Sequence, residues 1–401
     1  MITPQRLLAG VITLGLALAP ALATTPAAAS PGSFDATWAQ FHNSRSRAGV
    51  THAETLITRD TVHSLAVRWR SATFKTPEGI NSSPVVARGK VYIGSDDGRL
   101  WAFRARTGAR RWRFHTGGAV RGAAAVAGGR VYVGTAAGAI LALDADNGKP
   151  RWSYGIGGNV TASPLVVHGT VYIGSRGGMF VALNARTGRV KWKARTWSVW
   201  DSAAYADGLV YVASDKMQVA AFNAKTGAER WVRTTGVRMR SAPAVRGGRV
   251  FAGGDDGGVW AFHARKGRLL WHSAAAPSRT NATVRSGPAV SKGRVFVTTG
   301  ETTPMDGHAV AFDTATGKRL WRSHLADYST SSPAVANGLV FLGSFDHRLY
   351  AFDAATGRER WTSGWDAMHR GLNSSPAIAN GFIFVGCRDG SLYAYRPVRR
   401  G

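Results

Sequence analysis

The sequence predicts an all-β fold, an eight-bladed β-propeller with four-stranded antiparallel blades, and two observations carry this prediction. Tryptophans recur at intervals of about 40 residues, mostly just after a glycine-containing turn, and such a period is typical of propellers. Each interval also holds short runs of β-branched and aromatic residues separated by turn-forming residues. The repeating tryptophans are Trp69, Trp112, Trp152, Trp192, Trp231, Trp271, Trp321 and Trp361.

One repeat, from Asn81 to Trp112, illustrates how the sequence specifies the strands of a blade. Asp97-Gly98 predicts a hairpin turn, because this pair tolerates positive φ, and Thr107-Gly108 predicts a second turn. Near-continuous apolar runs are typical of strands that neighbouring blades cover on both faces. The four strands are expected at 83–87, 91–94, 100–104 and 111–113.

The last repeat, from 373 to 395, contains only three strand-like segments. Residues 65–70 resemble an outer strand without a blade, so we expect them to complete the last blade and close the ring, which removes two exposed sheet edges. The propeller then spans 65–397 and a basic tail follows at 398–401. Each repeating tryptophan is expected to pack between adjacent blades, where the small turn leaves room for its ring.

Residues 1–29 have the pattern of a secretory signal peptide, with a basic start at Arg6, an apolar run and two possible small-residue cleavage sites. The apolar run is too short to cross a bilayer comfortably, so no membrane span is expected. The protein is therefore expected to be secreted or extracytoplasmic, with a lead-in segment at 30–64. Cys387, the only cysteine, is expected to be a buried thiol and cannot form an intramolecular disulfide.

The formal net charge of +28 predicts attraction to polyanions. Turns that join strands one to two and three to four lie at one end of a blade, which we call the basic face because arginine and lysine dominate these turns. A polyanion site is expected there at Arg265, Lys266 and Arg268. The alternative is that the excess charge only favours solubility.

The opposite end, the mixed face, carries the loops between strands two and three and between blades. Departures from the repeat gather there, including Trp197, Trp200 and Asp201, a composition typical of binding hot spots. Arginines near the channel mouth would suit a carboxylate or an acidic peptide. The full expected site is Arg121, Trp197, Trp200, Asp201, Arg240, Arg285, Glu301, Asp306 and Arg370. The alternative is that these side chains pair with one another and seal the channel.

Motifs for catalysis and metal binding are missing from the sequence. No His-Glu-x-x-His, phosphate-binding loop or Gly-x-Ser-x-Gly elbow occurs, and the 11 histidines show no ligand spacing. Acidic turns such as Asp255-Asp256-Gly257 could bind calcium but fit hairpin turns better. No catalytic residue and no metal site are therefore expected.

The repeat segments Ala142–Trp152 (ALDADNGKPRW) and AFDAATGRERW, with the lead-in WAQFHNSRSRAGV, resemble the tryptophan-docking propellers of the quinoprotein family. This family includes dehydrogenases that hold pyrroloquinoline quinone (PQQ) with calcium, and non-enzymatic members such as the outer-membrane assembly factor BamB. The dehydrogenases typically carry adjacent cysteines near PQQ, and a single cysteine cannot supply that pair.

The resemblance therefore implies an exported, non-catalytic binding or scaffolding protein of the cell envelope with a protein or peptide partner and no cofactor. Two alternatives stay open. One is a dehydrogenase of alcohols or sugars that uses PQQ and calcium, and the other is an envelope protein that binds an anionic polymer through its basic face.

Overall fold

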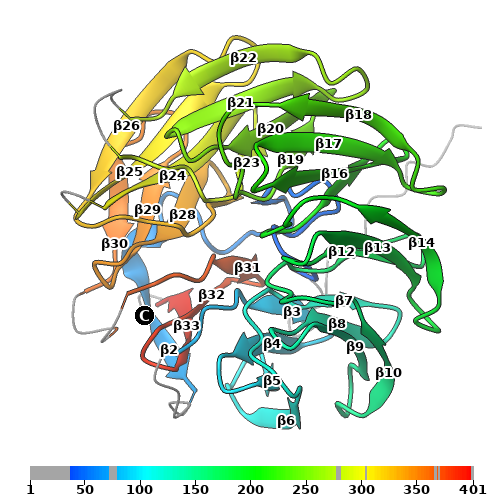
Figure 1. Ribbon diagram of the computed structural model, residues 1–401. Helices are drawn as coiled ribbons and strands as arrows, with labels where there is room; N and C mark the ends of the chain where they lie inside the picture. Colours follow the sequence, from blue (N-terminus) through cyan, green and yellow to red (C-terminus); the bar gives the residue numbers. More distant parts are fainter. Residues whose placement is uncertain are drawn as a thin grey trace, which may run out of the picture. The chain divides into compact units, whose positions relative to one another are not determined.

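Eight sheets, each built mainly of antiparallel strands, follow one another along the chain, and most neighbouring sheets contact through their innermost strands (Figure 1). The innermost strand of the first sheet also contacts that of the eighth, which closes the ring. The computed structural model describes residues 37–71, 79–276, 281–302, 305–364, 368 and 371–398. The predicted eight-bladed propeller is confirmed, whereas the predicted signal peptide at 1–29 and residues 399–401 of the tail lie outside the described residues.

Blades one to four each run from an innermost to an outermost strand in chain order. Blade one is β3 (Val85–Ala87), β4 (Lys90–Ser95), β5 (Arg99–Arg104) and β6 (Arg110–His115); blade two is β7 (Ala125–Ala127), β8 (Arg130–Gly134), β9 (Ala139–Asp144) and β10 (Pro150–Gly155). Blade three is β11 (Leu165–Val167), β12 (Thr170–Gly174), β13 (Met179–Asn184) and β14 (Val190–Arg195); blade four is β15 (Ala204–Ala206), β16 (Leu209–Ser214), β17 (Gln218–Asn223) and β18 (Glu229–Thr234).

Blades five to eight follow the same order, but blade seven has one extra inner strand from the lead-in, and residues 65–70 supply the outermost strand of blade eight. Blade five is β19 (Ala244–Arg246), β20 (Arg249–Gly253), β21 (Gly258–His263) and β22 (Leu269–Ala274); blade six is β23 (Ala289–Ser291), β24 (Arg294–Thr302), β25 (Met305–Asp313) and β26 (Arg319–Leu325). Blade seven is β1 (Val50–Thr51), β27 (Ala334–Ala336), β28 (Leu339–Gly343), β29 (Leu349–Asp353) and β30 (Glu359–Thr362); blade eight is β31 (Ala377–Ala379), β32 (Phe382–Gly386), β33 (Leu392–Pro397) and β2 (Leu65–Arg70).

The ring closes as the sequence predicts, because β2 pairs antiparallel with β33 and Trp69 stands opposite Ala394. Figure 1 shows the two strands side by side although they come from opposite ends of the chain. In the first blade the innermost strand is shorter than the expected 83–87, and the outermost strand is longer than the expected 111–113. The innermost strand is shorter because its antiparallel pairing with β4 runs only from Val85 to Ala87.

Each docked tryptophan contacts the turn of the following blade. The indole N–H of Trp69 donates to the carbonyl oxygen of Ala105 at 3.0 Å, and Trp112 makes the same bond to Ala145 at 3.2 Å. Gly108 has a φ of +72°, and a Cβ there would lie 2.7 Å from the Trp69 ring. Glycine is therefore required at this turn both by the backbone and by the ring that covers it. The predicted packing of tryptophans between blades is confirmed.

Trp361 of blade seven has no such turn to contact, because β33 is followed by no further strand of blade eight within the described residues. The lead-in segment supplies a replacement, the 3-10 helix η1 (Val62–Ser64), which packs against β30 and β33. Arg59 of the same segment forms an ion pair with Asp353 at 3.1 Å. The ring of Trp361 contacts the edge of Tyr395.

The start of the lead-in, residues 38–51, makes one circuit inside the ring, and we call it the inner belt. Trp38 and Val86 exchange two backbone hydrogen bonds of 2.8 and 2.9 Å in blade one, and Val335 of blade seven donates to Gly49 at 2.7 Å. The innermost strands would otherwise leave these N–H groups unpaired toward the channel. The donors, one for each blade from one to seven, are the backbone N–H groups of Val86, Val126, Val166, Tyr205, Val245, Val290 and Val335.

Two buried polar side chains of the inner belt fill the channel. The Arg47 guanidinium donates to the carbonyl oxygens of Ala203 at 2.9 Å, Pro164 at 3.0 Å and Phe41. Burial lowers the pKa of Arg47 to about 9, while the Asp201 carboxylate opposes this shift. Burial also lowers the pKa of His42 to about 3, so this imidazole is neutral at pH 7. Within the described residues, the lead-in thus places inside the ring a buried histidine and, next to blades three and four, a buried arginine.

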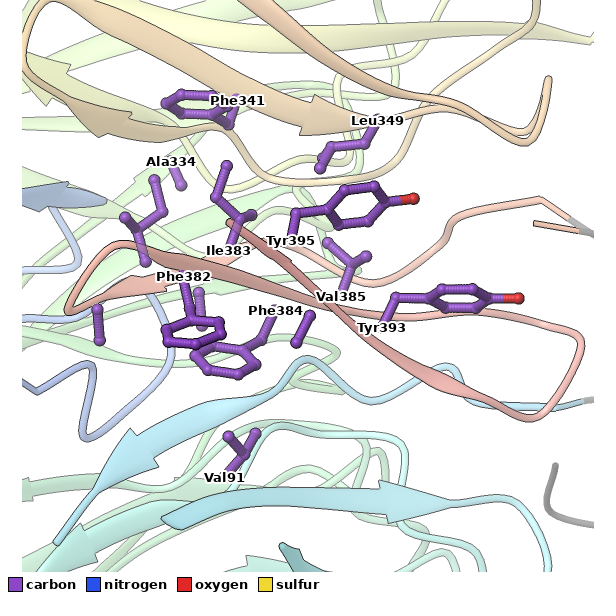
Figure 2. Packing of buried hydrophobic residues seen from close by; sticks show 14 of the residues in the cluster. Val91, Ala334, Phe341, Leu349, Phe382, Ile383, Phe384, Val385, Tyr393 and Tyr395 are labelled. Carbon is purple, nitrogen blue, oxygen red and sulfur yellow. The ribbon is translucent and has the colours of Figure 1, made fainter. Parts of the chain in front are cut away.

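The hydrophobic core lies between blades. Figure 2 shows Phe341 and Leu349 of blade seven on one side of Ile383 and Tyr395, and Val91 of blade one on the other side of blade eight. Cys387 is buried in the same cluster, as the sequence predicts for a packed thiol. Among the described residues, no helix has the length and apolar character needed to cross a membrane.

Candidate ligand-binding site at the channel mouth

One residue in each blade lies four positions before the innermost strand, and these residues surround the channel at the mixed face. We call them the mouth ring. A cavity of about 410 Å³ opens within it, lined by every member except Arg240 and by Phe41 of the inner belt. From blade one to blade eight the mouth ring is Asn81, Arg121, Thr161, Trp200, Arg240, Arg285, Thr330 and Asn373.

Blades seven, eight and one contribute a polar arc of the mouth ring. Thr330 donates its hydroxyl to the side-chain oxygen of Asn373, and the Asn373 amide donates to Asn81 at 2.9 Å. Asn81 in turn donates to Asp96. This arc satisfies its own hydrogen bonds, which favours a structural role for these three residues.

The arginines of the mouth ring pair with aspartates from the loop between strands two and three of the preceding blade. Arg121 Nε lies 2.8 Å from Asp96, and Arg240 Nε lies 2.7 Å from Asp215. Arg285 Nε lies 3.2 Å from Asp255. The predicted arginines therefore reach the mouth, but each already has a carboxylate partner.

A cation that sequence reasoning missed, Arg176, lies beside them. Its Cζ atom lies 3.3 Å from the centroid of the Trp200 ring, and Arg240 Cζ lies 4.8 Å from the same centroid. Burial lowers the pKa of Arg176, the nearby Asp215 carboxylate opposes this shift, and the positive charges of Arg240 and Arg121 add to it. The signal was available in the repeat, because Arg176 occupies the loop position that Asp96 and its equivalents occupy in other blades.

Asp201 has a structural place in the cavity wall. Around the channel, serine hydroxyls accept backbone N–H groups from the preceding blade, as Ser202 Oγ does from Ser163 at 3.0 Å. Blade five has Ala242 at this position, and Asp201 fills the gap by accepting from the Ser202 N–H at 2.7 Å and the Ala242 N–H at 3.1 Å. Burial raises the pKa of Asp201, and the charge of Arg47 opposes that shift.

Of the remaining predicted residues, Trp197 and Asp306 are described and do not line the cavity. Trp197 is 54% exposed and has Lys216 Nζ 5.2 Å from its ring centroid. Asp306 lies 3.2 Å from His324 and does not line the cavity. Glu301 is the strand partner of Asp306 in the β24–β25 hairpin, and its side chain is not among the described parts of the chain. Arg370 lies outside the described residues.

The predicted polyanion residues Arg265, Lys266 and Arg268 occupy the turn between β21 and β22, and all three are exposed. Within the described ranges none of them has an ion-pair partner. Arg88 and Lys90 on the same face are instead paired with Asp146 at 3.1 and 2.8 Å. The three residues thus carry unneutralised positive charge.

A planar quinone held with calcium needs an aromatic face to stack on and a set of oxygen ligands. The Arg176 guanidinium already covers a face of Trp200. Across the described part of the chain, no group of three or more His, Cys, Asp or Glu side chains is arranged to hold a metal ion. Among the described residues, one face of Trp200 is thus covered and no such set of metal ligands is present.

The sequence is similar to known proteins that are built from the same kind of repeat. A family model described as outer membrane protein assembly factor BamB matches residues 105–201, 194–288 and 276–399. BamB of Bordetella pertussis is 34% identical over 128 residues, which are 32% of this chain and 30% of that protein. The quinohemoprotein alcohol dehydrogenase ADH-IIG of Pseudomonas putida is 33% identical over 118 residues, 26% of this chain and 16% of that enzyme. The matched region thus spans less than a third of either relative.

Solved structures share the fold. BamB from Moraxella catarrhalis superposes with a TM-score of 0.68 at 18% identity, over 84% of this chain and 99% of that one. A europium-containing methanol dehydrogenase superposes with a TM-score of 0.76 at 15% identity, over 90% and 98%. At these identities the likeness concerns the fold alone.

Proposed function

The chain belongs to the family described as outer membrane protein assembly factor BamB, and from this premise we propose that it is an exported, non-catalytic binding or scaffolding protein of the cell envelope. Its partner is a protein, held on the mixed face. The signal-peptide pattern of residues 1–29 supports export. The matched relative from Bordetella pertussis is named as an assembly factor, which supports a protein partner.

One observation carries the placement of the partner. Trp197 and Met217 are large apolar side chains on the mixed face, 54% and 40% exposed. Lys216, the neighbour of Met217, lies against the Trp197 ring, so the two apolar groups belong to one patch beside the mouth ring. Exposed tryptophan next to charged groups is typical of interface hot spots.

Trp197→Ala is expected to reduce capture of the partner at least tenfold, because truncating a hot-spot residue removes about 2 kcal/mol or more. The measurement is quantitative mass spectrometry of proteins cross-linked to the tagged chain in its own envelope. Leu269→Ala is the matched control, since Leu269 is 44% exposed on a different surface, β22. A partner set that both variants retain equally would contradict the placement.

The PQQ-dependent alternative makes a separate prediction. Purified protein supplied with PQQ and calcium is expected to show no turnover of alcohols or aldoses with an artificial electron acceptor, because Arg176 occupies the face of Trp200. Absorption spectra of the dialysed mixture test binding independently of activity. Stoichiometric quinone retention together with turnover would replace the scaffold proposal by the dehydrogenase.

The unneutralised charge at Arg265, Lys266 and Arg268 supports a second candidate function, binding of an anionic polymer. Replacing all three with serine is expected to lower the slope of log affinity against log salt by about 2–3, since each phosphate contact contributes about 0.9. Fluorescence anisotropy with labelled DNA measures the slope. Arg88→Ser is the control because Arg88 is already paired with Asp146. An affinity that does not change with salt excludes this candidate.

A further inference from the structure

The charges around the mouth ring do not balance. Arg121, Arg240 and Arg285 are matched by Asp96, Asp215 and Asp255, as described above. Arg176 adds a fourth guanidinium, and no carboxylate among the described residues lies within ion-pair distance of it. The charge of Asp215 acts on Arg176 through space, but this carboxylate forms its ion pair with Arg240, so among the described residues the cavity edge at blades three and four has one guanidinium more than it has ion pairs.

The surroundings of Arg176 hold its guanidinium in place. Its Cζ atom lies over the Trp200 ring, 3.3 Å from the ring centroid. The Trp200 indole N–H donates a hydrogen bond to the Asp215 carboxylate, which holds the ring in position. Asp215 is also bound by Arg240 at 2.7 Å, so its carboxylate is already shared between two donors. A guanidinium stacked on an aromatic ring keeps its N–H edges for hydrogen bonding in the plane of the group. Arg176 is thus prepared to receive an oxyanion at little entropic cost.

The neighbouring groups define what kind of oxyanion fits. Trp197 lies in the loop between β14 and β15, and Met217 lies in the loop between β16 and β17; both side chains are exposed. A backbone hydrogen bond from the Asp215 N–H to the Ser198 carbonyl oxygen joins these two loops. An apolar group and a planar anion can therefore be bound side by side. A carboxylate matches the fork of a guanidinium through two parallel hydrogen bonds.

We propose that Arg176, supported by Trp200, is a carboxylate-binding subsite that receives an acidic side chain or a C-terminal carboxylate of the partner, next to an apolar residue held by Trp197 and Met217. This inference rests on the proposed function, because it names the chemistry of the segment that docks on the mixed face. The partner's carboxylate supplies an ion-pair partner for the additional guanidinium of the cavity edge. The mouth-ring arginines keep their aspartates and position the subsite without binding the ligand themselves.

The test uses the full protein and a pair of blocked tetrapeptides that contain either Asp-Leu or Asn-Leu at their centre. Calorimetry at low salt is expected to give an affinity for the Asp peptide about tenfold or more above that for the Asn peptide, as charge-assisted hydrogen bonds require. Arg176→Gln is expected to remove this preference without changing the unfolding temperature. Arg186→Gln is the matched control, because Arg186 is exposed in the same blade on the basic face, and it should keep the preference.

Two further arms separate the sources of the carboxylate and exclude simple charge attraction. A peptide with a free C-terminus and no acidic side chain tests the terminal carboxylate. Inorganic phosphate and acetate test bare anions. Equal affinities of wild type and Arg176→Gln for the Asp peptide, or phosphate competing as well as the peptide, would overturn the subsite.

Failure of this inference can be told apart from failure of the proposed function. Partner capture that depends on Trp197 but not on Arg176 leaves the scaffold proposal standing and rejects the carboxylate subsite. The opposite result is also possible: peptide binding depends on Arg176, but Trp197→Ala does not change partner capture. This result supports the subsite and rejects the docking surface.

Discussion

Removal of residues 1–70 is expected to abolish cooperative unfolding of the whole propeller. The deletion removes the outer strand of blade eight, the docked ring of Trp69 and the inner belt with Trp38 and Phe41. Each large buried aromatic lost costs about 3–5 kcal/mol, against a total stability of about 5–15 kcal/mol for a typical domain. The remaining chain should therefore lack a stable native state.

Thermal unfolding followed by circular dichroism and calorimetry measures this effect. Removal of residues 1–36 is the control, since it leaves every described contact intact. Trp69→Ala provides a milder variant that should still fold and lose about 3–5 kcal/mol. An unchanged transition after removal of 1–70 would show that blade eight does not need its N-terminal strand.

Arg47→Met is expected to destabilise the native state by about 3 kcal/mol or more. The substitution keeps the buried stem but leaves the carbonyl oxygens of Phe41, Ala203 and Pro164 without their donor, and each buried unsatisfied group costs about 1–3 kcal/mol. It also removes the positive charge of Arg47, which stabilises the buried Asp201 carboxylate and opposes the rise in the pKa of Asp201 that burial causes.

Urea denaturation of the wild type and the variant gives the difference in the free energy of unfolding. Arg45→Met is the matched control, because Arg45 is an exposed residue of the same belt and its loss should cost less than about 0.5 kcal/mol. Equal stabilities of the two variants would mean that Arg47 does not stabilise the ring from within.

The blades could be predicted because their determinants are local and recur eight times. A tryptophan, a glycine turn and two or three apolar runs fix each unit, and the unpaired segment around Trp69 indicates how the ring closes. The inner belt could not be predicted in the same way. Its residues show no strand periodicity, and their partners are one backbone group from each of seven distant strands.

The site was predictable only in part. Arg121 and Arg285 line the cavity at the mouth, and their positions just before an innermost strand were readable from the sequence, whereas their role in ligand binding stays a prediction. Their pairing with Asp96 and Asp255 depends on contacts between blades, which the pattern within a blade does not specify. Arg176 was missed because it lies in a hairpin loop, and Asp201 was assigned to a ligand site although the backbone of blades four and five uses its oxygens.

The inner belt has a consequence for the timing of folding during synthesis. Residues 38–51 leave the ribosome before any blade, yet their last partner, Val335, is made almost 300 residues later. Until blades seven and eight exist, the belt has no complete circle to occupy, and contacts of such long range form slowly. A growing chain should therefore remain incompletely folded until its synthesis is complete. Such a state is compatible with transport across a membrane, but it exposes unpaired strand edges to other chains. The inner belt is thus made before every blade but completes its hydrogen bonds only when blade seven is made.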